Sequence, residues 1–221
     1  GAHPAAIPGI NVDGEKVLTY REAILQERLP KSVIIIGAGA IGLEFATIWS
    51  SYGTQVTLVE MLPAVAPLED SEVSLELARA LTKRGIKIHV NTRVISVSLA
   101  SDSVNVTVEN SEGQLSLEAD QVLVAAGFKP NSLNLGLEEV GVELTERKFI
   151  KIDDAFSTNI PGIRAIGDVT GKLMLAHVAS KQGILCAEAI AGRTIEEIDY
   201  VMVPRATYCQ PQAASFGYTE A

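Results

Sequence analysis

The chain has 221 residues, which is enough for one large domain or two small ones. Hydrophobic residues make up 47% of it and charged residues 20%, a globular composition that excludes a disordered chain. Eighteen basic residues against 27 acidic ones give a formal net charge of -9, which argues against a nucleic-acid partner because such proteins concentrate positive charge. The longest apolar stretch, 33–43, is broken by glycines and is too short to span a bilayer, so no membrane contact is expected.

Cysteine content and the first residues bear on the cellular compartment. The only two cysteines, Cys186 and Cys209, lie far apart in the sequence, which excludes a disulfide scaffold. The chain opens without a charged segment followed by an apolar one, so we expect no secretion signal. These features favour a reducing, cytoplasmic setting, and we expect no metal site.

The first regular elements in the chain are a short helix and a βαβ unit. Thr19 and Glu22 form a capping box, which predicts a helix from Thr19 to residue 29. A β-branched apolar run at 33–36 then predicts a strand buried on both faces. A glycine-rich turn, a helix and a second strand follow at 37–42, 41–52 and 55–59.

The middle of the chain predicts one more helix and several strands. Helical spacing at 70–84, with Asp70 or Ser71 as N-cap, is followed by a strand at 86–90. Three segments then alternate apolar and polar residues, which predicts an antiparallel meander of half-exposed strands: 93–99, 104–109 and 114–118. An apolar strand at 121–126 ends at Gly127.

The composition becomes rich in loop residues after Gly127, over 131–150. Beyond it the sequence predicts a short strand at 163–166, which ends in Gly167 and Asp168, and a helix at 176–191. It also predicts an extended segment at 200–203 and a strand pair within 208–218. The pattern as a whole predicts an α/β protein with a Rossmann-like parallel sheet and an antiparallel three-stranded meander.

The turn at 37–42 reads G-x-G-x-x-G and lies between a buried strand and a helix, as a dinucleotide-binding motif requires. Gly37 permits the tight turn, Gly39 lets a pyrophosphate approach the backbone, and Gly42 lets the helix pack close to the strand. Free N–H groups and the positive end of the helix dipole then face the phosphates. We therefore expect these residues to bind the cofactor: Gly37, Ala38, Gly39, Ala40, Ile41, Gly42 and Leu43.

An acidic residue at the end of the second strand selects between the two nicotinamide cofactors. Glu60 directly follows Val59 and stands 18 residues after Gly42. A carboxylate there accepts hydrogen bonds from the ribose hydroxyls and repels a 2′-phosphate, so we expect NAD(H) rather than NADP(H). The alternative is that Glu60 is only a solvated residue at the strand end.

Several separate stretches match one family in order, over essentially the whole chain. They are Leu29-Pro-Lys-Ser32 leading into Gly37 to Ala46, and the segments 56–60, 122–131, 158–168, 174–177 and 208–217. On these residues the chain resembles the flavin-dependent pyridine nucleotide-disulfide oxidoreductases, and most closely the dihydrolipoamide dehydrogenase branch. Ala40 is small where glutathione-reductase-like members usually carry Tyr, which also favours this branch.

The resemblance implies a division into parts. Residues 1–9 would connect from an FAD domain, and 10–129 would be the NAD-binding domain. Residues 130–200 would be the second half of the FAD domain, incomplete here, and 201–221 the start of the dimerisation domain. The implied fold class is therefore a Rossmann-like NAD domain with its meander plus a partial FAD-domain segment.

The resemblance also implies roles for residues outside the glycine-rich turn. Glu44 would face the flavin and pair with a lysine near its reactive edge. Val94 and Gly127 would line the NAD site, and Asp168 would hold the ribityl and phosphate region of FAD. A helix N-terminus would stabilise negative charge on the reduced flavin, at Met174, Leu175, Ala176 and His177.

By the same resemblance, the intact enzyme would oxidise dihydrolipoyl groups with NAD, through FAD and a redox disulfide. Its partners would be NAD(H), FAD, a lipoyl-bearing acyltransferase subunit and a second copy of the chain. The family's C-x-x-x-x-C pair and its catalytic His followed by Glu have no counterpart among these 221 residues. We therefore expect no catalytic residue in this chain, beyond flavin-side support from Glu44, and no dithiol oxidation by it alone.

Two other interpretations stay open on the sequence. The chain could be a stand-alone, non-catalytic NAD-binding module, which the missing cysteine pair favours and the matched Asp168 disfavours. It could also belong to a mercuric reductase, a soluble transhydrogenase or an NADH oxidase, which share this central segment. Tighter binding of NADPH than of NADH would contradict both the Glu60 assignment and the dihydrolipoamide branch.

Overall fold

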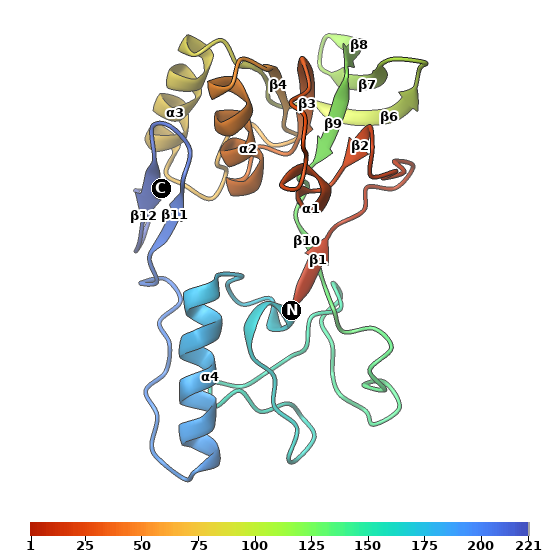
Figure 1. Cartoon of the computed structure of the whole chain (residues 1–221). Coiled ribbons are helices and arrows are strands. Elements are labelled where there is room, and N and C mark those ends of the chain that lie inside the picture. Colours follow the sequence, from red (N-terminus) through yellow and green to blue (C-terminus); the bar gives the residue numbers. More distant parts are fainter. Residues whose placement is uncertain (221) are drawn as a thin grey trace. The chain divides into compact units, whose positions relative to one another are not determined.

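A computed structural model describes residues 1–220, which fold into two compact units (Figure 1). The larger unit holds most of the regular structure and comprises, among the described residues, Pro4–Gly127, Ala206–Ser215, Thr219 and Glu220. The smaller unit comprises Gly1–His3, Phe128–Arg205 and Phe216–Tyr218.

The larger unit is built on a five-stranded parallel sheet, as the sequence predicts. Its strands, in spatial order, are β2 (Val17–Leu18), β9 (Gln121–Val124), β3 (Ser32–Ile36), β4 (Gln55–Val59) and β5 (Lys87–His89). The register pairs Val33 with Val56 and Ile34 with Val122, so β3 lies at the centre of the sheet. Because parallel strands all end at one edge, the segments that follow β3, β4 and β9 gather at the same edge.

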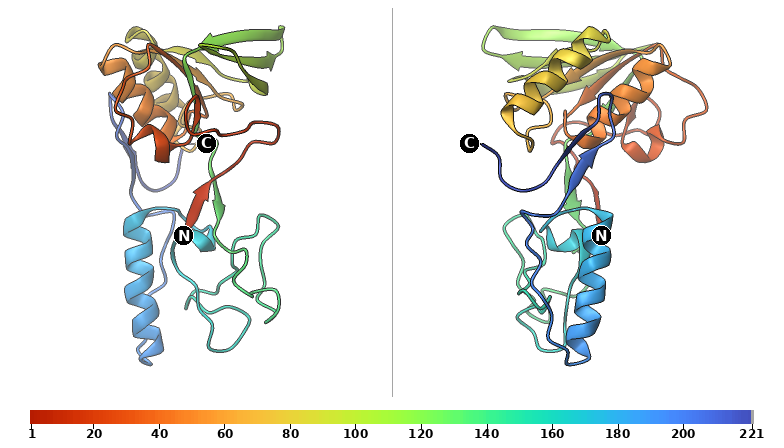
Figure 2. Two further views of the ribbon diagram at one scale, coloured as in Figure 1. Left: turned by 45° about the vertical axis from the view of Figure 1, so that its right-hand side comes forward. Right: turned by 90° about the vertical axis from the view of Figure 1, so that its left-hand side faces the viewer.

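Both faces of this sheet are covered (Figure 2). Helices α2 (Ala40–Ser51) and α3 (Ser71–Lys83) lie on one face, and the antiparallel meander of β6, β7 and β8 lies on the other: Arg93–Leu99, Val104–Asn110 and Gly113–Ala119. Val33 and Ile35 pack into the core on the helix side, while Ile34 and Ile36 pack against the meander. This two-sided burial explains why β3 has no polar alternation.

Helix α1 is shorter than the sequence predicts. It spans Tyr20–Ala23, and the predicted capping box between Thr19 and Glu22 is present, with Glu22 Oε2 accepting from the Thr19 N–H at 2.9 Å. The predicted continuation to residue 29 is wrong. Ile24 and Leu25 are 71% and 80% exposed, so no buried apolar face stabilises further turns.

The C-terminal strands are also shifted from their predicted positions. The two-stranded sheet is formed by β11 (Arg205–Thr207) and β12 (Ala213–Ser215). Residues 200–203 form no strand, and of the pair predicted within 208–218 only β12 lies there. A second small sheet pairs β1 (Ala2–Pro4) with β10 (Phe128–Pro130), which no local pattern signals.

The smaller unit contains one long helix, α4 (Ala176–Ile190), and a 3₁₀ turn, η1 (Gly167–Thr170). The predicted strand at 163–166 is wrong, because this segment pairs with the rest of the unit only through the isolated bridge between Ser157 and Arg164. A strand needs a neighbouring strand over its length, and the described residues of this unit offer none there. Cys186, on α4, is buried beside Phe156 and Leu185.

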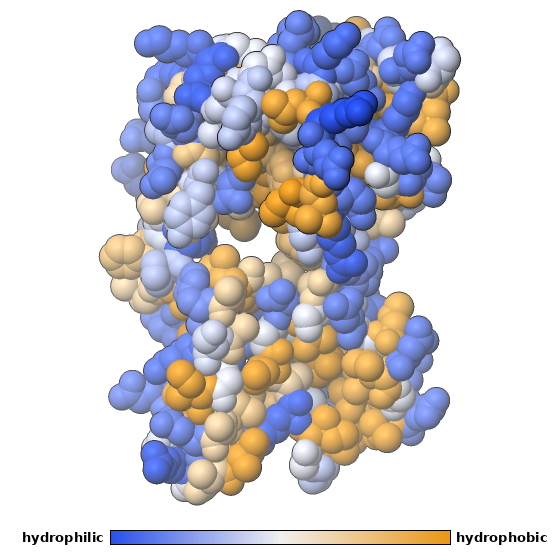
Figure 3. Space-filling model, in the orientation of Figure 1, coloured by the Kyte–Doolittle hydropathy of each residue, from blue (hydrophilic) through white to orange (hydrophobic). Residues whose placement is uncertain are grey.

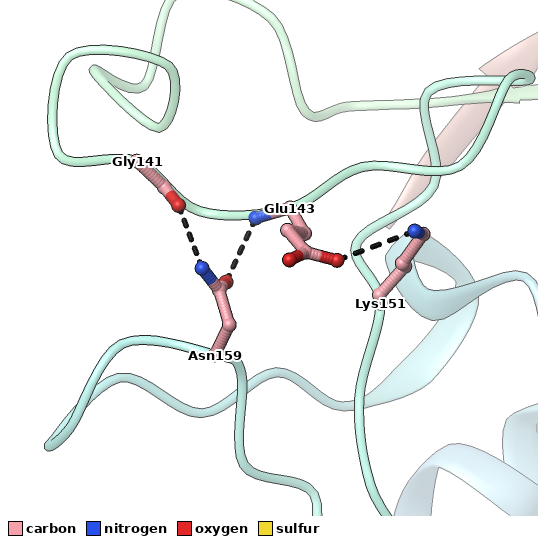
Figure 4. Close-up of polar contacts among 4 residues, drawn as sticks. All are labelled: Gly141, Glu143, Lys151 and Asn159. Atoms are coloured by element: carbon pink, nitrogen blue, oxygen red, sulfur yellow. Dashed lines mark hydrogen bonds and ion pairs between the residues drawn. The ribbon is translucent and has the colours of Figure 1, made fainter.

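Long loops in the smaller unit are fastened by side chains and by two isolated β-bridges, Leu144 with Ile150 and Ser157 with Arg164 (Figure 4). Asn159 Nδ2 donates to the carbonyl of Gly141 at 2.8 Å, and Asn159 Oδ1 accepts from the N–H of Glu143 at 2.8 Å. The side-chain amide thus binds the neighbouring loop as a strand backbone would. Lys151 Nζ lies 3.3 Å from Glu143 Oε2, and both side chains are more than half exposed.

Apolar side chains gather on the visible face of the smaller unit (Figure 3). Seven of its large apolar residues are more than half exposed: Leu133, Leu135, Val140, Ile184, Ile190, Phe216 and Tyr218. Within the part of the chain that the structure describes, no helix is both long and apolar enough to cross a membrane.

Replacing Asn159 by Ala should destabilise the smaller unit by about 1 kcal/mol, because two backbone groups lose their partner at once. The matched control is Lys151→Ala, which removes only an exposed ion pair and should change the stability by about 0–0.5 kcal/mol. Urea unfolding followed by circular dichroism measures both variants. Equal midpoints for the two variants would show that the Asn159 amide does not hold the loops together.

Candidate functional site

The glycine-rich turn joins the end of β3 to the start of α2 and requires glycine at two of its three positions. Gly37 has φ +106°, and a Cβ on it would lie 2.5 Å from the carbonyl oxygen of Ala125. A Cβ on Gly42 would lie 1.9 Å from the carbonyl oxygen of Gly37. Side chains at these positions would therefore push apart the turn, the helix and the neighbouring strand.

Gly39 differs from the other two glycines because nothing in the protein crowds it. It is the N-cap of α2, with φ -76° and ψ -172°, and a Cβ on it would meet no atom within 4 Å. The first N–H groups of α2 have no intrahelical acceptor, and the positive end of the helix dipole lies here. The turn is thus an open cradle of N–H donors that fits a phosphate group.

Glu60 follows β4 directly and is only 8% exposed. Its Oε2 accepts from the N–H of Ala38 at 2.7 Å, and its Oε1 accepts from the N–H of Leu62 at 2.8 Å. The carboxylate is therefore not a freely solvated group at a strand end. It links the strand, the glycine-rich turn and the segment after the strand, and lone pairs remain on both oxygens for further donors.

Val94 and Gly127 lie in the same unit as the glycine-rich turn. Val94 is half-buried in β6 and packs against the core on the meander side of the sheet. Gly127 has φ +96°, and its carbonyl accepts from the N–H of Ala5 at 2.9 Å. Both remain predicted cofactor contacts.

Glu44 lies one turn into α2 and has a partner that the sequence did not suggest. Its Oε1 accepts from the backbone N–H of Tyr208 at 2.9 Å. One turn further along the helix, Thr47 Oγ1 accepts from the N–H of Gln210 at 3.3 Å. Helix α2 thus holds the loop between β11 and β12 through the backbone N–H groups of that loop. The predicted support of a flavin by Glu44 remains a prediction.

Cys209 lies in the segment held by α2 and is 2% exposed. Its thiol donates to the carbonyl of Pro211 at 3.2 Å. Burial raises the pKa of the Cys209 thiol, and the nearby negative charge of Glu44 raises it further. The thiol is therefore kept protonated and unreactive.

The remaining predicted cofactor residues lie in the smaller unit. Asp168 is in the turn η1, and Met174, 38% exposed, precedes Leu175, the N-cap of α4. That cap makes no side-chain hydrogen bond, so N–H groups of the first turn of α4, which begins at Ala176, lack a capping acceptor. The ring of His177 is bound through Nε2 to the carbonyl of Pro204 at 2.9 Å.

A buried side chain that the sequence did not single out supports the Asp168 turn. Gln182, on α4, is 1% exposed; its Oε1 accepts from the N–H of Gly167 at 2.6 Å and its Nε2 donates to the Tyr200 hydroxyl at 2.9 Å. A glutamine on a helix has no local signal of burial, because its partners are 15 and 18 residues away.

Replacing Glu44 by Ala should increase the alkylation rate of Cys209 about tenfold. The variant loses the hydrogen bond from the Tyr208 N–H to a charged carboxylate, which stabilises the closed loop by about 1.4 kcal/mol, so the loop between β11 and β12 opens more often. Glu44→Gln keeps an acceptor for the Tyr208 N–H and should raise the rate less. Iodoacetamide labelling followed by peptide mass spectrometry measures Cys209 separately from Cys186. Glu72→Ala, at an exposed glutamate of α3, is the matched control. An unchanged rate in Glu44→Ala would show that this carboxylate does not hold the segment.

Comparisons with known proteins agree with this geometry. The sequence profile of the pyridine nucleotide-disulphide oxidoreductase family matches residues 1–183. Dihydrolipoyl dehydrogenase of Mycobacterium leprae is 50% identical over 221 residues, covering 100% of this chain and 47% of that protein. The mitochondrial dihydrolipoyl dehydrogenase of Pisum sativum is 39% identical over 222 residues, covering 100% of this chain and 44% of that protein.

Solved structures show the same likeness. LpdA from Mycobacterium tuberculosis superposes with a TM-score of 0.92 at 33% sequence identity, covering 100% of this chain and 47% of that one. The HOCl-induced flavoprotein disulfide reductase RclA from Escherichia coli superposes with a TM-score of 0.88 at 27% identity, covering 100% of this chain and 50% of that one. This chain spans about half the length of the relatives that it matches. Given these matches along its whole length, the chain belongs to the pyridine nucleotide-disulphide oxidoreductase family.

Proposed function

We propose that the chain is the NAD(H)-binding segment of a flavin disulfide oxidoreductase, most closely a dihydrolipoyl dehydrogenase. The observation that carries this proposal is the open turn at Gly39, set between β3 and α2 with the carboxylate of Glu60 bonded to it. This arrangement presents N–H donors for a pyrophosphate and a carboxylate for ribose hydroxyls. The relatives at 50% and 39% identity, both dihydrolipoyl dehydrogenases, support the choice of enzyme.

Each part of the turn has its own task in this proposal. The N–H groups at the start of α2, from Gly39 to Gly42, bind the pyrophosphate, whereas the N–H of Leu43 already donates to the Gly39 carbonyl at 3.0 Å. Gly37 and Gly42 let the backbone take the required shape. Glu60 accepts from the adenosine ribose, and Val94 and Gly127 line the adenine and nicotinamide sides.

The flavin-side residues form the second half of the proposal. Asp168 holds the ribityl and phosphate region, and the uncapped N-terminus of α4, from Met174 to His177, faces the flavin pyrimidine. Glu44 would support the flavin side as well. Bound FAD and NAD would supply hydride transfer between flavin and nicotinamide, and the protein would orient the rings and exclude water.

The proposal extends to the whole enzyme of which this chain would be a segment. Residues 1–9 would lead from the FAD domain, 10–129 form the NAD domain, 130–200 belong to the FAD domain and 201–221 begin the dimerisation domain. The intact protein would be a cytoplasmic homodimer that oxidises dihydrolipoyl groups on an acyltransferase subunit with NAD. The uncapped α4 and the Asp168 turn favour this over a stand-alone NAD module, which has no use for them.

The pair Gly39→Ala and Gly42→Ala tests the pyrophosphate site. A methyl group at Gly39 meets only open space, so this variant should fold normally yet lose NADH binding by at least about tenfold, since the methyl occupies the place of the pyrophosphate. Gly42→Ala should lose both binding and stability, because its Cβ meets the Gly37 carbonyl. NADH fluorescence titration and thermal unfolding measure the two effects. Unchanged NADH affinity in a folded Gly39→Ala variant would contradict the proposed site.

Cofactor selectivity tests the role of Glu60. The wild-type chain should bind NADH at least about tenfold more tightly than NADPH, because a 2′-phosphate would face a carboxylate. Glu60→Gln removes the charge and should reduce this preference, whereas Glu109→Gln, a control at a half-exposed glutamate of the meander, should not. Calorimetric titration with both nucleotides gives the ratios, and circular dichroism checks that each variant is folded. Tighter NADPH binding by the wild type would exclude the assignment.

A further inference from the structure

Ala38 lies between two glycines of the turn, and both of its backbone polar groups, the N–H and the carbonyl, are hydrogen-bonded. Its N–H donates to Glu60 Oε2 at 2.7 Å, and its carbonyl accepts from the N–H of Ala66 at 2.8 Å. Ala38 itself is fully buried. Since Gly37 and Gly39 have no side chains to fix their conformation, these two hydrogen bonds, together with that from the Gly37 N–H to the Val59 carbonyl at 2.8 Å, set the direction of the backbone in the turn.

Ala66 is held in an unfavourable backbone conformation. It lies in the segment 61–69 between β4 and α3, with φ +44°, and is 5% exposed. A left-handed conformation is costly for a residue with a Cβ and persists only where neighbouring contacts enforce it. In this conformation the N–H of Ala66 reaches Ala38 while its carbonyl accepts from the N–H of Glu69 at 2.9 Å.

Ser74 supplies a further contact that enforces this conformation. It is on the first turns of α3, is 3% exposed, and its Oγ donates to the carbonyl of Ala66 at 3.1 Å. A serine hydroxyl in a helix commonly bonds to a carbonyl of its own preceding turn. Here the hydroxyl is directed out of its helix and onto the loop.

We propose that Ser74 is a positioning residue for the dinucleotide, acting through Ala66 and Ala38 on the phosphate-binding turn. This inference rests on the proposed NAD(H) function. The hydroxyl of Ser74 offsets the unfavourable conformation of Ala66, and Ala66 in turn fixes the carbonyl of Ala38. The N–H groups of the turn then point at the pyrophosphate before it arrives, so little ordering remains at the moment of binding.

Ser74→Ala in the full chain removes one neutral hydrogen bond and should weaken NADH binding about 3- to 10-fold. The affinity for ADP-ribose, which carries the same pyrophosphate without nicotinamide, should fall by the same factor. Fluorescence titration with NADH and displacement by ADP-ribose measure these affinities at a temperature where every variant is folded by circular dichroism. The control is Ser71→Ala, an exposed serine at the start of the same helix, which should bind as the wild type does.

A second-site variant separates positioning from general destabilisation. Glycine tolerates the left-handed conformation, so Ala66→Gly no longer needs the Ser74 bond. The double variant Ser74→Ala with Ala66→Gly should therefore recover NADH affinity to within about twofold of Ala66→Gly alone. A purely structural role of Ser74 would lower the melting temperature but would not produce this recovery.

The outcomes distinguish the inference from the function on which it rests. Wild-type affinity for NADH in Ser74→Ala, or no recovery in the double variant, would overturn the inference and leave the NAD(H) site standing. Absence of NADH binding by the wild-type chain would overturn the proposed function and the inference with it.

Discussion

Helix α2 can lie where it does because Gly42 has no Cβ. A methyl group there would be 1.9 Å from the carbonyl oxygen of Gly37, so any side chain would move the helix off the sheet. With the helix in place, Leu43, Ala46 and Trp49 enter the core against β3 and β4. The helix N-terminus is then aimed past Gly39 at the edge where the parallel strands end, which is why the candidate site lies there.

The closeness of α2 to the sheet has consequences on both of its sides. Toward the sheet edge, the turn is near enough to Glu60 and Ala66 to be bonded by both. Toward the outside, Glu44 and Thr47 accept hydrogen bonds from the loop backbone at Tyr208 and Gln210. One helix therefore organises the proposed phosphate site and also the attachment of the C-terminal segment, so a change in its position would affect both.

The smaller unit follows a different principle. Its loops are fastened by single side chains, such as the amide of Asn159 and the buried Gln182, and not by strand ladders. Several of its large apolar residues are exposed, and the chain spans about half the length of its relatives. Its apolar core consists of two small clusters, around Val142 and Ile150 and around Phe156 and Leu185, which agrees with the proposal that it is one part of an FAD domain.

The sequence by itself determined the elements whose signals are local. The G-x-G-x-x-G turn, the strands at β3 and β4 and the α3 cap at Asp70 all follow from neighbouring residues, as does the meander. Only the tertiary structure decided that α1 stops at Ala23 and that 163–166 is not a strand, because both depend on whether a distant partner buries the segment. It also decided that Glu44 binds Tyr208 and that Ser74 reaches Ala66. The partners in these two contacts are 164 and 8 residues apart in the sequence, and no helix or strand periodicity links them. They are therefore brought together only when the sheet, helices and loops pack.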